Sequence, residues 1–134
     1  MFNPFSPLVY YVKIQTNEMV VKNISTCETI KKKSPKPFSS KRLILADFEP
    51  ASELLKSIIA ELRPSFFYPI YYNIAIHVMG PIEGGLSEIE KRALRDLAEY
   101  AGAKNVLISE YKYSLKDQQI TEGFKSRNWK FGYN

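Results

Sequence analysis

The sequence of 134 residues contains one cysteine, one histidine and no apolar run that approaches the roughly 20 residues needed to span a bilayer. Cys27 alone cannot form an intrachain disulfide, and one cysteine with one histidine cannot assemble a Cys/His metal cluster. Residues 1–7 have neither a basic start nor an unbroken apolar core, so they do not resemble a secretory signal. We therefore expect a cytoplasmic protein without a metal site or thiol chemistry.

Hydrophobic residues make up 45% of the chain and aromatic residues 13%, which is enough for one domain with a core but leaves no room for two. Lys and Arg number 19 against 14 Asp and Glu, and the net charge of +5 permits an anionic partner such as nucleic acid or a lipid surface without requiring one. We expect a single domain over residues 1–134, with a basic, aromatic C-terminal extension over residues 111–134.

The first part of the chain predicts a hairpin followed by a third strand and a loop. Val, Tyr and Ile are concentrated in residues 8–13 and 19–22, on either side of a turn at Thr16-Asn17-Glu18. A third strand is expected at residues 27–32. Residues 31–42 are interpreted as a loop, because their two prolines cannot continue a strand ladder.

A helix and a strand are expected next. Pro50 suits the first helical position, and apolar residues at three- and four-residue spacing continue until Arg63-Pro64. Residues 70–79 then alternate as a strand whose core face carries Tyr72, Ile74, Ile76 and Val78. His77 lies on the other face, where a packed strand histidine is favoured over a catalytic one, since the sequence identifies no partner for it.

The stretch from residue 70 to residue 110 has the order strand, glycine loop, amphipathic helix, strand, which indicates a βαβ unit with parallel strands. Gly102 is expected to end the helix, and residues 105–109 form a short buried strand. Residues 114–125 predict a polar helix broken at Gly123. The whole pattern indicates an α/β fold with a mixed sheet and helices packed on it.

One acidic residue of the amphipathic helix stands out. On a helical wheel that starts at Ile89, the apolar residues, Tyr100 among them, fall in one sector. Glu90 falls inside this apolar sector, while the other charges lie on the opposite side. Two interpretations stay open. Ser87 and Glu90 have the spacing of a capping box. Alternatively, the carboxylate points into a cleft, where it positions a water molecule.

Two groups of residues are candidates for binding. The basic candidates are Lys31, Lys32, Lys33, Lys36, Lys41 and Arg42, which form either a solvated connection or a patch that binds phosphates. The aromatic candidates are Trp129, Phe131 and Tyr133, which would share one face of a strand. Their rings either cover the domain's own core or form a platform for stacking bases or docking a partner.

Several segments resemble MreB, the bacterial actin family. They are Ala46-Asp47-Phe48, the helix segment Ile89-Glu90-Lys91-Arg92-Ala93-Leu94, the turn Ala101-Gly102-Ala103 and the strand Val106-Leu107-Ile108-Ser109-Glu110. The resemblance implies an actin-like subdomain of the ribonuclease-H type, with antiparallel strands continued by parallel ones. It also implies that Glu90 occupies the position of a glutamate that helps to place the water attacking ATP.

The departures from the family argue against catalysis. Actin-like ATPases carry an Asp-x-Gly-Thr phosphate loop near the N-terminus, whereas this chain has no Gly before Gly80 and no Asp before Asp47. The glycine loop at residues 80–85 contains Glu83, with Glu88 close behind, and those charges would repel a phosphate. A metal-dependent hydrolase is weakly supported, since Asp47, Glu90 and Glu110 are spread along the chain.

We therefore expect no cofactor and no ATPase activity, with Glu90 as a vestige of a catalytic position. The leading hypothesis is a non-catalytic MreB-like domain that binds a protein, such as a filament or a component of the cell-shape machinery. The alternative is a nucleic-acid-binding module that uses the basic loop and the aromatic tail.

Overall fold

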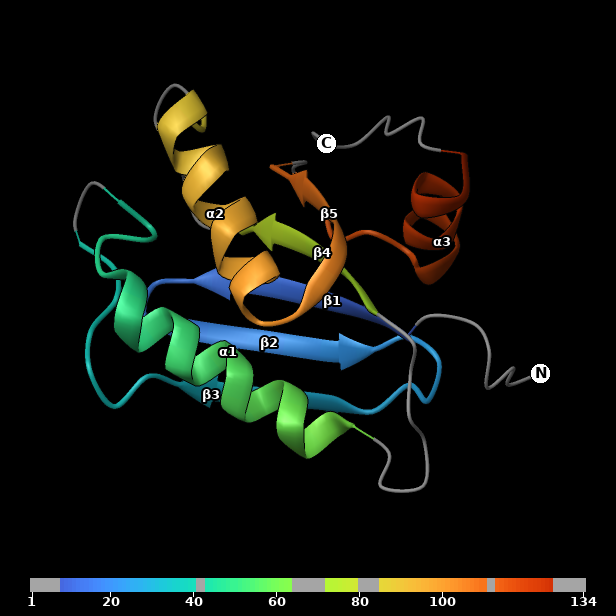
Figure 1. Cartoon of the computed structure of the whole chain (residues 1–134), viewed down its shortest axis with the longest axis horizontal. Helices are drawn as coiled ribbons and strands as arrows, with labels where there is room; N and C mark the ends of the chain where they lie inside the picture. Colours follow the sequence, from blue (N-terminus) through green and yellow to red (C-terminus); the bar gives the residue numbers. More distant parts are fainter. Residues whose placement is uncertain (1–7, 41–42, 64–71, 80–84, 111–112, 127–134) are drawn as a thin grey trace.

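The computed structural model describes residues 8–40, 43–63, 72–79, 85–110 and 113–126, in which five strands form one sheet and three helices pack against it (Figure 1). The elements follow in the order β1 (Leu8–Gln15), β2 (Glu18–Asn23), β3 (Thr29–Lys33), α1 (Phe48–Leu62), β4 (Tyr72–Val78), α2 (Glu88–Tyr100), β5 (Ala103–Ser109) and α3 (Asp117–Ser126). The expected α/β class is confirmed.

The strands lie in the order β3-β2-β1-β4-β5. β2 runs antiparallel to β1 and β3, whereas β4 runs parallel to both β1 and β5. The predicted hairpin and the predicted βαβ unit, β4–α2–β5, are therefore both present. Both faces of β4 are buried, since residues near the C-terminal end pack on its second face, and Asn73, Ala75 and His77 are enclosed there.

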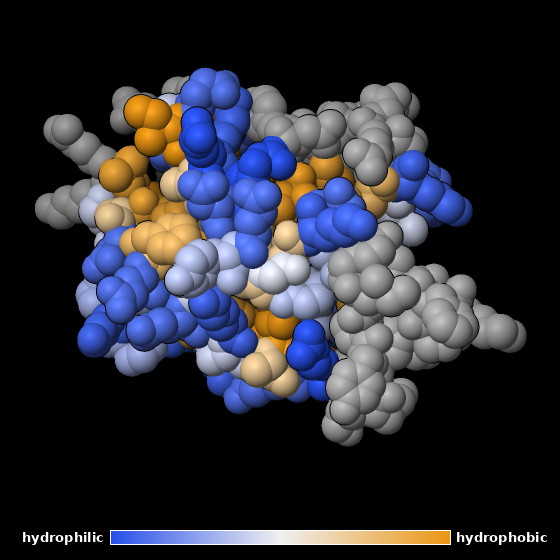
Figure 2. Space-filling model, in the orientation of Figure 1, coloured by the Kyte–Doolittle hydropathy of each residue, from blue (hydrophilic) through white to orange (hydrophobic). Residues whose placement is uncertain are grey.

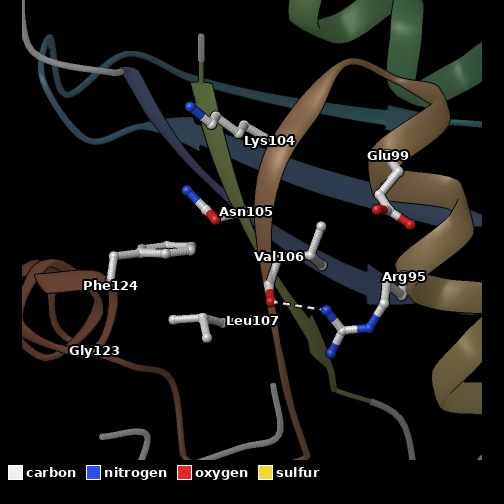
Figure 3. A pocket seen from close by; sticks show the side chains of 8 residues that line it. All are labelled: Arg95, Glu99, Lys104, Asn105, Val106, Leu107, Gly123 and Phe124. Carbon is white, nitrogen blue, oxygen red and sulfur yellow. Dashed lines mark hydrogen bonds between the residues drawn. The ribbon is translucent and has the colours of Figure 1, made fainter. Parts of the chain in front are cut away.

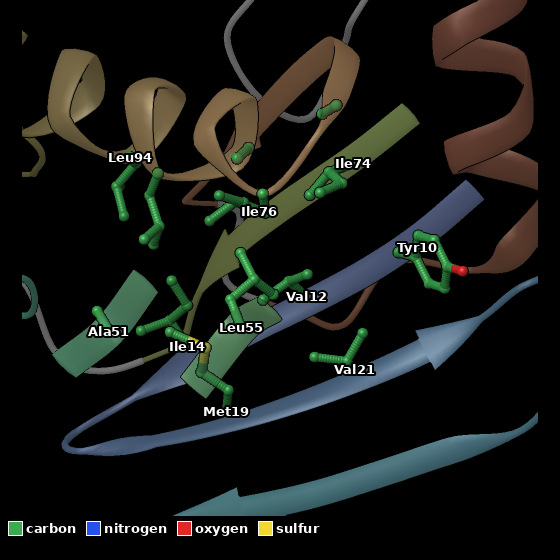
Figure 4. Packing of buried hydrophobic residues seen from close by; sticks show 14 of the residues in the cluster. Tyr10, Val12, Ile14, Met19, Val21, Ala51, Leu55, Ile74, Ile76 and Leu94 are labelled. Carbon is green, nitrogen blue, oxygen red and sulfur yellow. The ribbon is translucent and has the colours of Figure 1, made fainter. Parts of the chain in front are cut away.

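The main core lies between the sheet and the two helices α1 and α2 (Figure 4). Val12 and Ile76 project from neighbouring strands toward Leu55 of α1 and Leu94 of α2, and all four side chains are fully buried. Burying an aliphatic side chain of this size contributes about 1.5–3 kcal/mol. No helix in the described part of the chain is long and apolar enough to cross a membrane.

α3 packs on the opposite face of the sheet through a smaller cluster that joins Leu115 and Ile120 to Tyr11, Ala75 and Leu107. The prediction of a break at Gly123 was wrong, because α3 continues through this residue to Ser126. A glycine inside a helix costs about 1 kcal/mol relative to alanine. The packing of the helix against the sheet offsets that cost.

Two boundaries differ from the sequence predictions. The third strand, expected over residues 27–32, is present as β3, and the loop expected from residue 31 starts later, because Lys31, Lys32 and Lys33 all pair with β2, which supplies the backbone hydrogen bonds that a lysine run does not encode. α1 begins at Phe48, so Pro50 stands at its third position instead of its first. Proline is tolerated there because the N–H groups of the first turn have no partner inside the helix.

The turn between β1 and β2 is tied to the connection that leads into α1. Asn17 has a φ angle of 54°, and its side-chain oxygen accepts hydrogen bonds from the backbone N–H groups of Phe38 at 2.8 Å and Ser39 at 2.7 Å. The backbone N–H of Asn17 in turn donates to the Ser39 hydroxyl at 3.0 Å. The Phe38 side chain is fully buried, so this junction fixes a segment that belongs to the core.

A second close junction joins the end of α2 to β4. Gly102 has a φ angle of +112°, and a Cβ atom there would lie 2.1 Å from the hydroxyl oxygen of Tyr72. That hydroxyl donates a hydrogen bond to the backbone carbonyl of Ala101. Only glycine fits between the helix end and the Tyr72 ring.

The same ring lies edge-on to the buried ring of Tyr10, with 5.4 Å between the centroids. Burial and, to a smaller extent, the nearby Tyr72 raise the pKa of Tyr10 to about 12, while Arg63 acts in the opposite direction. Burial likewise raises the pKa of Tyr72. Both tyrosines are therefore neutral below about pH 10, in keeping with their place in the core.

Candidate binding surfaces

Glu90, the acid singled out by the helical wheel, is part of a capping box at the start of α2. The backbone N–H of Ser87 donates to the Glu90 carboxylate at 3.1 Å, and the backbone N–H of Glu90 donates to the Ser87 hydroxyl at 3.2 Å. These two bonds satisfy donors that a helix N-terminus leaves without intrahelical partners. The capping interpretation is confirmed.

Glu110 has a comparable structural contact. One of its carboxylate oxygens accepts a hydrogen bond from the backbone N–H of Leu86 at 3.1 Å, and the other would lie 2.9 Å from a Cβ atom at Gly85. Asp47 precedes α1 as its N-cap residue, without a side-chain capping bond. Within the described residues, no three His, Cys, Asp or Glu side chains form a group that could hold a metal ion.

His77, the single histidine, is fully buried in β4, as expected of a packed strand histidine. The hydroxyl of Tyr11 lies 2.6 Å from its Nδ1 atom and accepts a hydrogen bond from the backbone N–H of Leu115 at 2.9 Å. Since that hydroxyl already accepts from Leu115, its own hydrogen can point to Nδ1. Burial raises the pKa of Tyr11, while the bond from Leu115 lowers it. The network fixes the segment that leads into α3.

The predicted basic cluster is divided between the two faces of the sheet. Lys32 points toward α1, where its ammonium group lies 2.8 Å from the Glu61 carboxylate. Lys31 projects from the opposite face and lies 3.6 Å from Glu18. Lys36 is exposed in the connection after β3. The other predicted binding residues, Lys41, Arg42, Trp129, Phe131 and Tyr133, lie outside the described residues.

The sheet face opposite α1 and α2 carries four lysines from three strands, and we call it the lysine face. Its members are Lys13 of β1, Lys22 of β2, and Lys31 and Lys33 of β3. The ammonium group of Lys22 binds both carboxylate oxygens of Asp117, at 3.0 and 2.9 Å. Counting Glu18 and Asp117, the face carries two more lysines than carboxylates.

A pocket of about 120 Å³ lies on this face beside the start of α3. Lys13 and Lys22 both line it, and the Lys13 ammonium group lies 5.4 Å from the centroid of the Tyr11 ring. Neither lysine is among the binding residues predicted from the sequence. Alternation along each strand, combined with the register that the Thr16-Asn17 turn imposes, would have placed Lys13 opposite Val20, on the sheet face that also carries Lys31.

A larger pocket, of about 220 Å³, opens along β5, the strand at the other edge of the sheet (Figure 3). Its walls come from the two helices that flank this edge, through Arg95 and Glu99 of α2 and through Gly123 and Phe124 of α3. Its floor is formed by residues 104–107 of β5. We call this pocket the β5 groove.

The face that carries α1 and α2 is mostly hydrophilic, and apolar atoms reach the surface in separate patches (Figure 2). The helical wheel was wrong about two residues here, because Ile89 and Tyr100 are 81% and 65% exposed. The buried side of α2 is formed by Leu94, Leu97 and Ala98, so the helix is rotated relative to the predicted sector. The Tyr100 ring instead contacts Phe48 and Lys56 of α1.

The comparison with known proteins gives one similarity. The chain is 29% identical over 100 residues to the uncharacterized protein YjaA of Escherichia coli strain K12, and the match covers 71% of this chain and 76% of YjaA. No protein-family model matches the chain, and no solved structure matches it. The name of YjaA states no activity, so function is argued from the geometry of the surfaces.

Proposed function

We propose that the chain is a non-catalytic binding module built on an actin-like subdomain of the ribonuclease-H type. The strand order, in which antiparallel strands at one side are continued by parallel strands, is the arrangement that the resemblance to MreB implies. The observation that carries the non-catalytic part is the capping box, since the Glu90 carboxylate accepts a hydrogen bond from the backbone of its own helix.

In this proposal the partner is a cytoplasmic protein. The resemblance to MreB favours a filament or another component of the cell-shape machinery. The β5 groove and the lysine face are the two surfaces through which such contacts would be made, because each combines charged side chains with accessible strand residues.

An assay of ATP hydrolysis tests the non-catalytic part. We expect the purified chain with Mg²⁺ and ATP to release phosphate no faster than the buffer, and Glu90→Gln to behave in the same way. Glutamine also completes a capping box, so this variant should keep the start of α2 intact. Turnover by the parent chain that disappears in Glu90→Gln would overturn the proposal, and it could not be ascribed to unfolding.

A second candidate function is the binding of single-stranded nucleic acid by the lysine face. The observation that favours it is the gathering of four lysines on one sheet face, with the Lys31 side chain 66% exposed. Lysine contacts to phosphates release counterions, so binding of this kind weakens steeply as salt is added.

Fluorescence anisotropy with a labelled single-stranded RNA tests this second function. If three lysines contact phosphates, we expect affinity to fall about 20-fold between about 50 and 200 mM salt. The triple variant Lys13→Ala/Lys31→Ala/Lys33→Ala should lose most of the binding. The matched control is Lys32→Ala/Lys56→Ala/Lys91→Ala, which removes the same charge from the helix-bearing side. Equal losses in both variants would rule out a specific role for the lysine face.

A further inference from the structure

β5 is an edge strand whose outer side opens into the β5 groove between two helices. Edge strands present backbone N–H and C=O groups that can pair with another chain, and proteins commonly cover such an edge or place charges on it. Here α2 and α3 flank the edge on opposite faces of the sheet without closing over residues 104–107 (Figure 3). The groove therefore leaves space for one more strand to pair with β5.

Val106 shows which backbone groups face the groove. Its carbonyl oxygen accepts a hydrogen bond at 3.4 Å from the guanidinium of Arg95, a residue that lines the groove (Figure 3). In a strand the N–H and C=O of one residue point to the same side, so the N–H of Val106 is directed to the groove as well. At 3.4 Å this bond is longer than the roughly 2.7–3.2 Å that is usual for N–H···O bonds, so it is easily exchanged.

The charges around the groove favour an acidic partner. Arg95 and Lys104 line it against a single carboxylate, that of Glu99. An incoming strand that donates its own N–H to the Val106 carbonyl would release the Arg95 guanidinium. That guanidinium could then form a bidentate pair with a carboxylate on the incoming strand, an interaction stronger than the contact it replaces.

The opposite wall offers a place for an apolar side chain. Leu107 and Phe124 lie together on the α3 side of β5, across the strand from Arg95 (Figure 3). Gly123, in the same wall, has no side chain to block the approach of a second backbone. The volume of about 220 Å³ is below the roughly 300–1,000 Å³ of pockets that enclose small molecules, so the groove suits side chains of a bound peptide better than a cofactor.

We propose that the β5 groove binds an extended segment of a partner protein, which adds a strand to the edge of the sheet at Val106, places a carboxylate against Arg95 and sets an apolar side chain against Phe124. This mode of recognition takes affinity from backbone hydrogen bonds and specificity from alternate side chains. It deepens the proposed function, which names the β5 groove as one of two surfaces for contact with a protein, but it does not depend on any relation to actins.

The test uses the full chain labelled with ¹⁵N and a pair of acetylated peptides of about nine residues that alternate Thr and Val. One peptide has Glu at its centre and its twin has Gln. We expect titration with the Glu peptide to shift the β5 amide signals and to slow hydrogen exchange at the Val106 N–H about tenfold or more. The Glu peptide should bind about tenfold more tightly than the Gln peptide, the difference that one charge-assisted contact provides.

Two sets of variants separate backbone pairing from side-chain effects. Val106→Pro removes the outward N–H at a position where an edge strand tolerates proline, and it should abolish the protection at β5. Val106→Ala loses similar packing but keeps the N–H, and it should bind within about threefold of the parent chain. Arg95→Ala should remove the preference for Glu over Gln, and this result remains informative even if Val106→Pro fails to fold.

Three results would overturn the proposal. The first is that neither peptide shifts the β5 signals at about 1 mM. That result would mean that Arg95 only protects the edge of β5 from pairing with another chain. The second is equal binding by Val106→Pro and Val106→Ala. The third is a shift of the β5 signals that depends on protein concentration without peptide, which would assign the groove to a second copy of the chain.

Discussion

The Asn17→Ala variant is expected to lose about 3 kcal/mol of unfolding free energy, measured by urea denaturation followed by circular dichroism. The Asn17 side chain accepts hydrogen bonds from the backbone of Phe38 and Ser39, and alanine would leave both donors without this acceptor in a partly buried position. Each unsatisfied donor costs about 1 kcal/mol or more. The φ angle of 54° adds strain of about 1 kcal/mol, because a left-handed conformation is unfavourable for alanine.

Two variants at the same position separate these causes. Asn17→Asp keeps an acceptor oxygen and tolerates the left-handed conformation, so it should stay within about 1 kcal/mol of the parent chain. Asn17→Gly relieves the strain but lacks the acceptor, and it should lose about 2 kcal/mol. A loss in Asn17→Asp as large as in Asn17→Ala would show that the two hydrogen bonds are not the cause.

Gly102→Ala is expected to cost about 4 kcal/mol, a large share of the roughly 5–15 kcal/mol that stabilises a typical domain. The new methyl group would lie 2.1 Å from the Tyr72 hydroxyl, and the φ angle of +112° is unfavourable for any residue with a Cβ atom. The Tyr72 ring packs edge-on against the buried ring of Tyr10, which restricts its movement out of the way. Urea denaturation measures the loss.

Gly85→Ala is the matched control, since Gly85 also has a positive φ angle, of +79°. Its new methyl group would meet the end of the Glu110 side chain at 2.9 Å, and a carboxylate can move more easily than a packed ring. We expect a loss of about 2 kcal/mol there. In the double variant Tyr72→Phe/Gly102→Ala the closest contact is gone, so the combined loss should be smaller than the sum of the single losses. Strict additivity would show that backbone strain alone causes the effect.

The parts of the fold that depend on neighbouring residues could be predicted from the sequence. The turn at Thr16-Asn17 and the alternation on either side of it indicate the β1–β2 hairpin, and the spacing of Ser87 and Glu90 indicates the capping box. The βαβ unit around α2 followed from the change of hydrophobic period between strand and helix. Each of these signals lies within one element or its immediate flank.

The binding surfaces could not be predicted in the same way, because they depend on contacts between distant segments. The lysine face exists only through the register that sets Lys13 opposite Val20 and Val20 opposite Lys31. The β5 groove needs α2, β5 and α3 in place together. The end of β3 was also misplaced, since the proline-containing segment from residue 31 suggests a loop while pairing with β2 extends the strand to Lys33. The helical wheel placed Ile89 wrongly because the period of the apolar residues does not give the rotation of a helix about its own axis when it packs on the sheet.

The central position of β1 has a consequence for the newly made chain. β1 leaves the ribosome before the two strands that pair with it, and only its pairing with β2 is local, because its other edge pairs with β4, where Ile14 lies opposite Val78. At about 5–20 residues per second, the synthesis of the intervening segment takes several seconds. During that interval the edge of β1 that later pairs with β4 has no partner, and the strand is rich in apolar residues. The nascent chain is therefore most vulnerable to incorrect pairing and aggregation before β4 emerges.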